Sequence, residues 1–491
     1  MSALQHPYYP IIYLRGYAMT QDEIEDTVAT PYMGFNLGST KVKQEWDRSI
    51  AMHTFESPLV RLMKDYQYQD SYKDGKAMEG PLPARSVIVY RYYDQASRQI
   101  GQGDTPSVPD AAAGLSDLVL KLRDQVCGKN AQARAAFKVY LVAHSMGGLV
   151  CRSFLQNDAV GSAEAKALVD KVFTYGTPHN GIEVFGLNVP QFFGPFDINN
   201  FSRSEMRKYL ALPMTSERVD SLNGKFDPAR FFCLVGTNHR DYSLARIPVG
   251  PMSDGLVKIE NATVQGAPRA FVFRSHSGHF GLVNSEEGYQ NLVRFLFGDT
   301  SVSARLETAS MPLPPRVQAA KDEGLEVRAS YLFEATVSTR GAFNINLTER
   351  RADDASAIFR SFDELLRPTR LQREKPRTPV LFSVFLDTAR IQVGRTLVFG
   401  VKIVVRSTEY LVLGTNQRYP AEVLFDETLT IRATVKPEGW RLRYVLADQW
   451  SESTGREMLL DASTGLAVIP LENRKGFKGS LQMDFSRWNA S

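Results

Sequence analysis

The chain has 491 residues, of which 43% are hydrophobic and 23% are charged. This length exceeds what one hydrophobic core usually organises, so we expect two domains. A net charge of +4 is too small to indicate nucleic-acid binding as the main role, and no segment approaches the roughly 18 uncharged apolar residues of a membrane span. The composition therefore predicts a soluble globular protein, or at most a peripheral membrane protein.

The three cysteines, Cys127, Cys151 and Cys233, lie in or beside apolar runs and lack the spacing of metal ligands. We expect buried free thiols rather than a disulfide framework, and we predict neither a metal nor a cofactor. The N-terminal stretch MSALQHPYYPIIYLRGY lacks a basic region followed by a long apolar one. We therefore expect no secretory signal and a cytoplasmic protein, with export by a route that needs no signal peptide as the alternative.

Up to about residue 300, short apolar runs alternate with helix-like segments. The runs are rich in Val, Ile, Phe and Tyr, as buried strands are. Strands are predicted over residues 10–16, 86–93, 137–144, 171–177, 230–237 and 270–275. Helices are predicted over 110–129, 145–157 and 284–298, the last with Asn284 as its N-cap. This alternation predicts an α/β fold with a mostly parallel sheet covered on both faces.

Two segments interrupt the alternation. Residues 18–85 are polar, aromatic and irregular, and residues 180–229 contain the aromatic stretch GIEVFGLNVPQFFGPF. Loops of this length inside a compact domain are usually functional. Both segments are therefore predicted to be lid or cap insertions.

From residue 301 the pattern changes to strand-like runs of alternating polarity with little helix. These runs predict an antiparallel β-sandwich, and the Pro-rich stretch ASMPLPPRVQ (309–318) is a predicted linker. We predict an α/β domain over 1–300 and a β-sandwich-like accessory domain over 301–491. The basic stretch RPTRLQREKPR (367–377) is interpreted as a solvated loop, with contact to an anionic membrane surface as the alternative.

The stretch KVYLVAHSMGGLVCR passes from a predicted strand to a predicted helix at Ser145. A sharp turn at this point needs small neighbours, which Ala143, Gly147 and Gly148 supply, as in the G-x-S-x-G nucleophile elbow. Ala143 replaces the usual first glycine, at a position that needs a small side chain. The N–H of Met146 would then lie at a helix N-terminus, where it can stabilise an oxyanion.

A nucleophilic serine needs a base, and the base needs an acid that orients it. In this type of fold the chain order is serine, acid, histidine, and only His239, His276 and His279 come late enough to be the base. His279 is preferred because it lies in a Gly-flanked loop between the last predicted strand and the last predicted helix. His276 is interpreted as a structural neighbour and remains the alternative base.

For the acid, Asp254 is preferred because Gly255 allows a tight turn before an apolar run. Asp241, just beyond a predicted strand, is the competing candidate. The second oxyanion donor is expected in the loop after the first strand. There, Gly16 lets the backbone bend inward and would present the N–H of Tyr17.

Four segments, HSMGGLV, YGTPHNG, SDGLV and GHFGLVNS, occur in this order. In combination they resemble the lipase branch of the α/β-hydrolase superfamily, over most of the predicted α/β domain. HSMGGLV also resembles the corresponding stretch of GPI-inositol deacylase-like proteins. The resemblance implies Ser145 as the nucleophile, Asp254 as the acid, His279 as the base, and Met146 and Tyr17 as oxyanion donors.

Two further features bear on the substrate. Many lipases have His-Gly where this chain has Arg15 and a glycine, and Arg15 is expected either to favour an anionic head group or to pair with a neighbouring acid. The stretch FGLNVPQFFGPFDINNF resembles a lipase lid. Its Phe185, Phe192 and Phe193 are expected to shelter an acyl pocket, or alternatively to pack as a core cap.

These features predict a serine-dependent carboxylic ester hydrolase, a lipase or esterase, that acts on apolar acyl or lipid esters through an acyl-enzyme. A phospholipase, as an exported effector, and a GPI-inositol deacylase-like enzyme are the alternatives. A non-catalytic lipid- or protein-binding module is the least favoured reading. The expected partners are the ester or lipid substrate and a lipid surface, with no nucleic acid.

Overall fold

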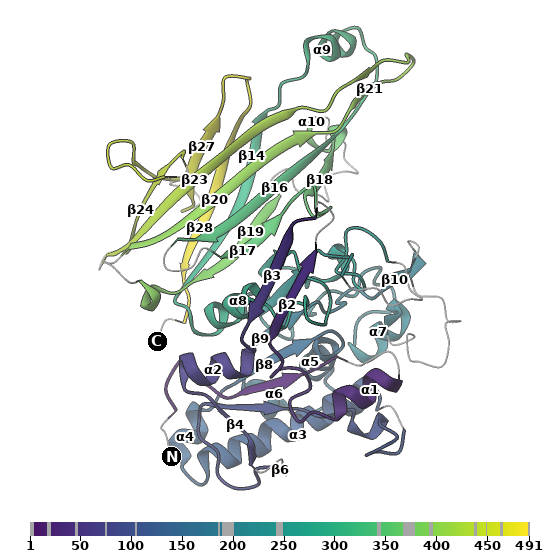
Figure 1. Cartoon of the computed structure of the whole chain (residues 1–491), viewed down its shortest axis with the longest axis vertical. Helices are drawn as coiled ribbons and strands as arrows, with labels where there is room; N and C mark the ends of the chain where they lie inside the picture. Colours follow the sequence, from purple (N-terminus) through teal and green to yellow (C-terminus); the bar gives the residue numbers. More distant parts are fainter. Residues whose placement is uncertain are drawn as a thin grey trace. The chain divides into compact units, whose positions relative to one another are not determined.

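The computed structural model describes residues 4–16, 21–44, 48–73, 76–103, 106–184, 187–188, 201–241, 249–340, 345–366, 379–391, 396–436, 439–447, 449–461 and 465–489. The chain forms two compact units. One comprises Met1–Arg269, Phe273–Phe297 and Ser491, and the other comprises Ala270–Val272 and Gly298–Ala490. Figure 1 labels the elements of both units.

A seven-stranded sheet is found as far as the chain is described, in the order β13-β12-β9-β8-β1-β7-β4. Six of its strands form the centre of the first unit, and the edge strand β13 belongs, apart from Arg269, to the second. The neighbouring pairs from β12 to β4 are parallel. The strands are β1 (Ile11–Leu14), β4 (Gln69–Asp70), β7 (Ser86–Val89), β8 (Val139–His144), β9 (Val169–Tyr175), β12 (Phe231–Gly236) and β13 (Arg269–Val272). Every residue of β1, β8, β9 and β12 is buried, which explains why β1 and β12 are uninterrupted apolar runs in the sequence. Among these strands, β9 also buries the charged side chains of Asp170 and Lys171.

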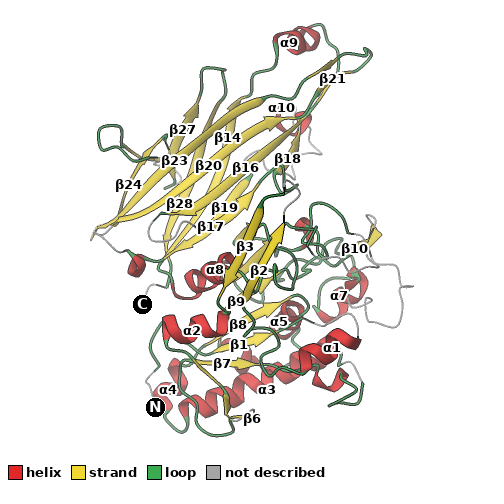
Figure 2. Cartoon of the chain, in the orientation of Figure 1, coloured by secondary structure: helices red, strands yellow, loops and turns green. Residues whose placement is uncertain are grey.

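Helices accompany this sheet (Figure 2). They are α1 (Gln21–Val28), α2 (Pro58–Tyr66), α3 (Val108–Cys127), α4 (Ala131–Ala136), α5 (Gly147–Gln156), α6 (Ala163–Ala167), α7 (Arg203–Tyr209) and α8 (Glu286–Phe297). The ring of Phe295 in α8 lies 5.3 Å from that of Phe232 in β12 and 6.1 Å from that of Phe173 in β9, so this helix packs on the sheet. The predicted N-cap of α8 is wrong by one residue: Ser285, not Asn284, accepts the N–H of Gly288 through its Oγ, at 3.0 Å.

Secondary structure also occurs in the two segments predicted to be insertions. In the first, β2 (Ser39–Gln44) and β3 (Ile50–Phe55) form an antiparallel hairpin. A shorter pair, β5 (Tyr72–Lys73) and β6 (Lys76–Ala77), follows α2. In the second, β10 (Glu183–Val184) pairs with β11 (Leu187–Asn188), and α7 follows.

The second unit consists mainly of antiparallel strands. One sheet has the order β19-β14-β28-β27-β26, and a larger one has the order β17-β16-β20-β23-β24-β25 with β18 beside β16. The first contains β14 (Thr300–Ser310), β19 (Val380–Leu386), β26 (Leu459–Leu460), β27 (Ala467–Glu472) and β28 (Lys478–Arg487). The second contains β16 (Ser330–Thr339), β17 (Asn346–Arg350), β18 (Ile358–Ser361), β20 (Thr396–Ser407), β23 (Val423–Lys436), β24 (Gly439–Val445) and β25 (Arg456–Glu457).

Smaller elements complete the second unit. They are α9 (Pro315–Asp322), α10 (Phe362–Leu366), and a small sheet of β15 (Val327–Arg328), β21 (Tyr410–Val412) and β22 (Arg418–Tyr419). The prediction of a linker at 309–318 is wrong, because β14 already belongs to this unit and α9 begins at Pro315. The basic stretch 367–377 lies outside the described residues.

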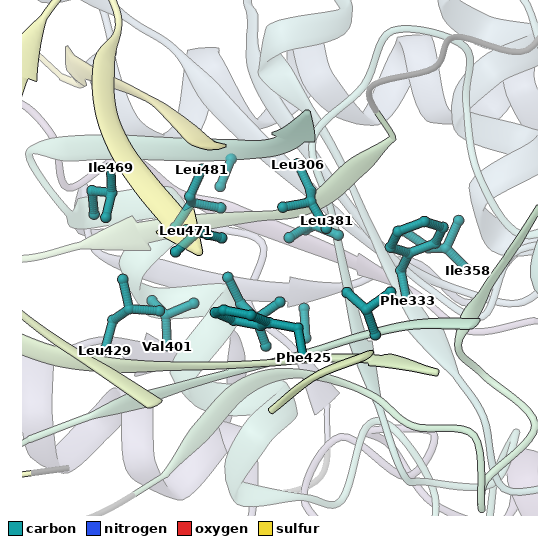
Figure 3. Packing of buried hydrophobic residues seen from close by; sticks show 14 of the residues in the cluster. Leu306, Phe333, Ile358, Leu381, Val401, Phe425, Leu429, Ile469, Leu471 and Leu481 are labelled. Carbon is teal, nitrogen blue, oxygen red and sulfur yellow. The ribbon is translucent and has the colours of Figure 1, made fainter. Parts of the chain in front are cut away.

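The two large antiparallel sheets of this unit share one apolar core. Figure 3 shows Leu306, Leu471 and Leu481 of one sheet facing Val401 and Phe425 of the other. All five side chains are buried. This face-to-face packing is that of a β-sandwich.

Within the described ranges, no helix is both long and apolar enough to cross a membrane. The thiols of Cys127, Cys151 and Cys233 are free and buried, as predicted.

Candidate active site

Ser145 stands directly after the carboxyl end of β8, two residues before α5 begins at Gly147. Its φ is +53°, a left-handed conformation that a residue with a side chain seldom adopts. Three hydrogen bonds fix this backbone. The N–H of Ser145 donates to the carbonyl of Tyr175 at 2.9 Å, and the carbonyl of Ser145 accepts from Thr177 Oγ1 at 2.8 Å and from the N–H of Gly148 at 3.1 Å.

Three glycines surround this turn because neighbouring atoms leave no room for side chains. A Cβ at Gly16 would lie 2.3 Å from the Cβ of Ser145 and 2.9 Å from the backbone nitrogen of Met146. At Gly147 it would meet the carbonyl oxygen of Leu14 at 2.5 Å, and at Gly148 it would meet Thr177 Oγ1 at 2.3 Å. The loop after β1 therefore lies directly against the serine, as the sequence predicts for Gly16.

His276, which follows β13, is the histidine that reaches Ser145. Its Nε2 lies 3.0 Å from the Oγ of Ser145, and both residues are buried. The predicted pairing of Ser145 with His279 is wrong: His279 is exposed, one residue beyond Gly278, whose φ is +86°. The chain turns outward at this glycine, so His279 lies on the outside of the loop that carries His276.

Asp254 holds the other side of the His276 ring. Its Oδ2 accepts a hydrogen bond from Nδ1 of His276 at 2.8 Å. Its Oδ1 accepts the N–H groups of Leu256 at 3.0 Å and Val257 at 2.8 Å. Because a carboxylate here only accepts, the ring proton lies on Nδ1, which leaves the lone pair of Nε2 facing the hydroxyl of Ser145.

The competing candidates lie elsewhere. Asp241 forms an ion pair with Nζ of Lys43 at 2.6 Å and accepts from the amide of Asn238 at 2.6 Å. His239 is half-buried in the loop that follows β12. Partial burial, followed by the charges of Arg240 and Lys258, lowers its pKa.

His144, the residue before the serine, contributes a second imidazole to the site. Its Nε2 lies 2.9 Å from the backbone carbonyl oxygen of His276, and the centroids of the two imidazole rings are 5.0 Å apart. Complete burial, then the neighbouring His276 and the charge of Arg15, hold the pKa of His144 well below its usual value. This ring is therefore neutral, and no pattern in the sequence marks it as part of the site.

A buried arginine, which no pattern in the sequence marks, supports the helix that follows the serine. Arg152 in α5 is fully buried. It donates to the carbonyl oxygens of His179 at 2.8 Å, Val219 at 2.7 Å and Ser221 at 2.8 Å, and to the side chain of Gln156 at 2.8 Å. Burial lowers its pKa to about 10, so Arg152 stays charged at neutral pH. Its hydrogen bonds attach the backbone at His179, Val219 and Ser221 to α5.

The contacts of His179, in the YGTPHNG segment, indicate a structural role. Its Nε2 lies 3.1 Å from Thr174 Oγ1, and this hydroxyl in turn donates to the carbonyl of Phe232. Burial, followed by the charge of Arg152, lowers the pKa of His179 well below its usual value. It is a second buried neutral histidine, on a different part of the fold from the Ser145 hydroxyl.

The remaining predicted site residues are described in part. Met146 directly precedes α5, so its N–H lies at the helix N-terminus as expected. Arg15 donates from Nη1 to the carbonyl of Met33 at 3.0 Å. Four predicted residues lie outside the described ranges and stay predictions: Tyr17, Phe185, Phe192 and Phe193. Among the residues that are described, no group of three His, Cys, Asp or Glu side chains is placed to hold a metal ion.

The chain is similar to one protein-family model and to several solved structures. Residues 104–210 match the model of the PGAP1-like alpha/beta domain family. No curated protein sequence matches the chain. Among solved structures, phospholipase PlaB from Legionella pneumophila is 12% identical, with 85% of this chain and 90% of that chain covered and a TM-score of 0.34.

Two further structures are similar over smaller parts. The product of gene lin2722 from Listeria innocua is 15% identical, with 59% of this chain and 93% of that chain covered and a TM-score of 0.26. An acetylxylan esterase is 15% identical, with 38% and 76% covered and a TM-score of 0.20.

The parallel sheet, the strand–serine–helix turn after β8 and the match over 104–210 agree on one fold. The first unit has the α/β-hydrolase fold, and a region rich in antiparallel strands follows it. Both parts of the predicted fold class are confirmed.

Proposed function

We propose that the chain is a serine hydrolase that cleaves carboxylic esters of lipids or other apolar acyl groups through an acyl-enzyme. The observation that supports this most directly is the hydrogen-bonded series from Asp254 through His276 to Ser145, with contacts of 2.8 and 3.0 Å. A serine hydroxyl is a weak nucleophile by itself, and an adjacent oriented base activates it.

The steps follow from where the protons lie. Nε2 of His276 takes the proton of Ser145 as Oγ attacks the ester carbonyl, and Asp254 stabilises the imidazolium that forms. His276 then gives this proton to the leaving alcohol. In the second half, His276 takes a proton from water, the resulting hydroxide attacks the acyl-enzyme, and Ser145 is released with its proton restored.

The negative charge on the carbonyl oxygen needs donors that are already in place. The N–H of Met146 lies at the N-terminus of α5, where the helix dipole also favours an anion. Gly16 brings the loop after β1 against Ser145, so the N–H of Tyr17 is our proposed second donor.

The direct test is covalent labelling with a fluorophosphonate, which reacts only with an activated serine. The wild-type chain should be labelled at Ser145, and Ser145→Ala should not be labelled. Thr177→Val is a useful companion, because it removes only the hydroxyl that supports the Ser145 carbonyl and should slow labelling without abolishing it. A folded wild-type chain that resists labelling would show that the arrangement is not catalytic.

The substrate class needs a second experiment. The rate of hydrolysis is measured for soluble esters of increasing acyl length, with and without a lipid interface. Fatty acid release is measured in parallel from phosphatidylglycerol and phosphatidylcholine vesicles, and Ser145→Ala is the blank for both. Rates that rise with acyl length support the lipase or esterase proposal. Fatty acid release from vesicles that exceeds hydrolysis of soluble short esters favours the phospholipase alternative.

A further inference from the structure

We propose that His144 is a positioning residue: it holds the backbone of His276 so that Nε2 of His276 meets Ser145 while Nδ1 meets Asp254. This inference rests on the proposed function of the Ser145 site. It adds a residue that takes no part in the proton transfers. The contact that carries it is the 2.9 Å hydrogen bond from His144 Nε2 to the carbonyl oxygen of His276.

The direction of this hydrogen bond fixes the tautomer of His144. A backbone carbonyl only accepts, so Nε2 of His144 must carry the proton and donate. A neutral imidazole has one N–H, and this contact uses it. His144 therefore enters the site as a fixed dipole, with its N–H directed at the peptide that follows His276.

His276 is thereby held on both sides of its Cα. Its own N–H donates to the backbone carbonyl of Asp254 at 2.8 Å, and its carbonyl accepts from His144. The ring lies between these two anchors. The residues immediately after His276 lead into an exposed turn at Gly278 and His279. The hydrogen bond from His144 therefore holds the backbone at the point between the His276 ring and this exposed turn.

The neutral state of His144 also matters for the charge balance. The rings of His144 and His276 are 5.0 Å apart in a buried region. A second positive charge at this distance would oppose the imidazolium that forms on His276 during the proposed reaction. Burial keeps His144 neutral, so no second positive charge stands beside the imidazolium that forms on His276.

The test compares variants that keep or remove the donor. His144→Gln keeps an N–H near the position of Nε2, whereas His144→Phe keeps a ring of similar size and has no donor. A second variant without a donor, His144→Leu, serves if the phenylalanine does not fold. His179→Phe is the matched control, since it also replaces a buried neutral histidine, one that contacts Thr174 instead of His276.

Two readouts separate positioning from general stability. The first is the low-field proton NMR resonance of the Nδ1–H of His276, which reports its hydrogen bond to Asp254 and needs no catalysis. The second is the rate of fluorophosphonate labelling of Ser145, measured as a function of pH. We expect His144→Phe to lose the resonance and to label about 10- to 100-fold more slowly, and His144→Gln and His179→Phe to keep both near the wild-type values.

The outcomes distinguish the two proposals. If Ser145 is labelled and a folded His144→Phe or His144→Leu keeps the resonance and the rate, the positioning role is refuted while the hydrolase stands. If wild-type Ser145 is never labelled but the resonance is present and is lost in His144→Phe, the positioning role stands and the hydrolase is refuted. Equal losses in His179→Phe and His144→Phe would also refute the positioning role.

Discussion

His276 lies with its Nε2 3.0 Å from the Oγ of Ser145, whereas His279, three residues further along the same loop, is exposed. This difference gives a matched pair of variants. His276→Gln should lower kcat by about 10³- to 10⁴-fold because the base is lost, and His279→Gln should keep kcat within about threefold of wild type. Hydrolysis of a soluble ester measures both, and the reverse ranking would place the base at His279 after all.

The two candidate acids allow the same kind of comparison. Asp254→Asn retains the size of the side chain but removes the carboxylate that stabilises the imidazolium, so kcat should fall by about 10⁴-fold. Asp241→Asn weakens the ion pair with Lys43 and alters the hydrogen bond from Asn238, and it should leave kcat nearly unchanged. Circular dichroism verifies that both variants fold. Activity that survives in Asp254→Asn but not in Asp241→Asn would contradict our assignment of the acid.

Gly16 is predicted to tolerate no side chain. In Gly16→Ala the new methyl group would lie 2.3 Å from the Cβ of Ser145, which must displace either the elbow or the loop after β1. We expect the labelling rate of Ser145 to fall by about 100-fold, as small misplacements at a reacting centre do. Gly80→Ala is the control, because no atom lies within 4 Å of its added methyl group. Unchanged labelling in a folded Gly16→Ala would show that this close contact relaxes freely.

Lys171 gives a prediction about stability and pH. Burial lowers the pKa of its ammonium from 10.5 to about 7 in the folded chain, while the unfolded chain keeps the ordinary value. Between about pH 7 and pH 10 the unfolded state therefore binds more protons, so this group makes the free energy of unfolding rise with pH. Below pH 7 both states are protonated and the full penalty of burying the charge remains.

Lys171→Met isolates this contribution. The free energy of unfolding of the variant minus that of wild type should decrease steadily from pH 7 to pH 9.5, measured by denaturant titration at each pH. Tyr140, whose ring centroid lies 5.2 Å from Nζ of Lys171, has a pKa that burial raises well above its usual value, so it stays protonated in the folded chain over this range. A difference that is independent of pH would mean that the Lys171 ammonium is not perturbed by burial.

The features that the sequence predicted well are those encoded by neighbouring residues. The strands around Val139–His144 and Phe231–Gly236 are buried on both faces and so appear as apolar runs. The small residues after Ser145 form a recognisable short pattern, although the atoms that leave no room for side chains there, the carbonyl oxygen of Leu14 and Oγ1 of Thr177, come from other parts of the chain. Recognising these strands and this pattern needs no knowledge of how distant parts of the chain meet.

The choice between His276 and His279 could not be made in that way. Both follow the same strand and both lie near glycines, and only the path of the loop decides which one turns inward. One signal was available: His276 is nearer to the carboxyl end of β13, and the ends of neighbouring parallel strands meet at one edge of the sheet. The start of α9 at Pro315, inside the stretch 309–318 that was predicted to be a linker, was missed because proline is favoured in the first turn of a helix as well as in linkers.

The guanidinium of Arg152 donates to the carbonyl oxygens of His179, Val219 and Ser221. All three acceptors are main-chain atoms. Main-chain carbonyls are present whatever the side chains are. These three attachments to α5 therefore do not depend on which side chains stand at positions 179, 219 and 221. Substitutions at those positions leave the acceptors in place, whereas a single substitution of Arg152 removes all three hydrogen bonds at once.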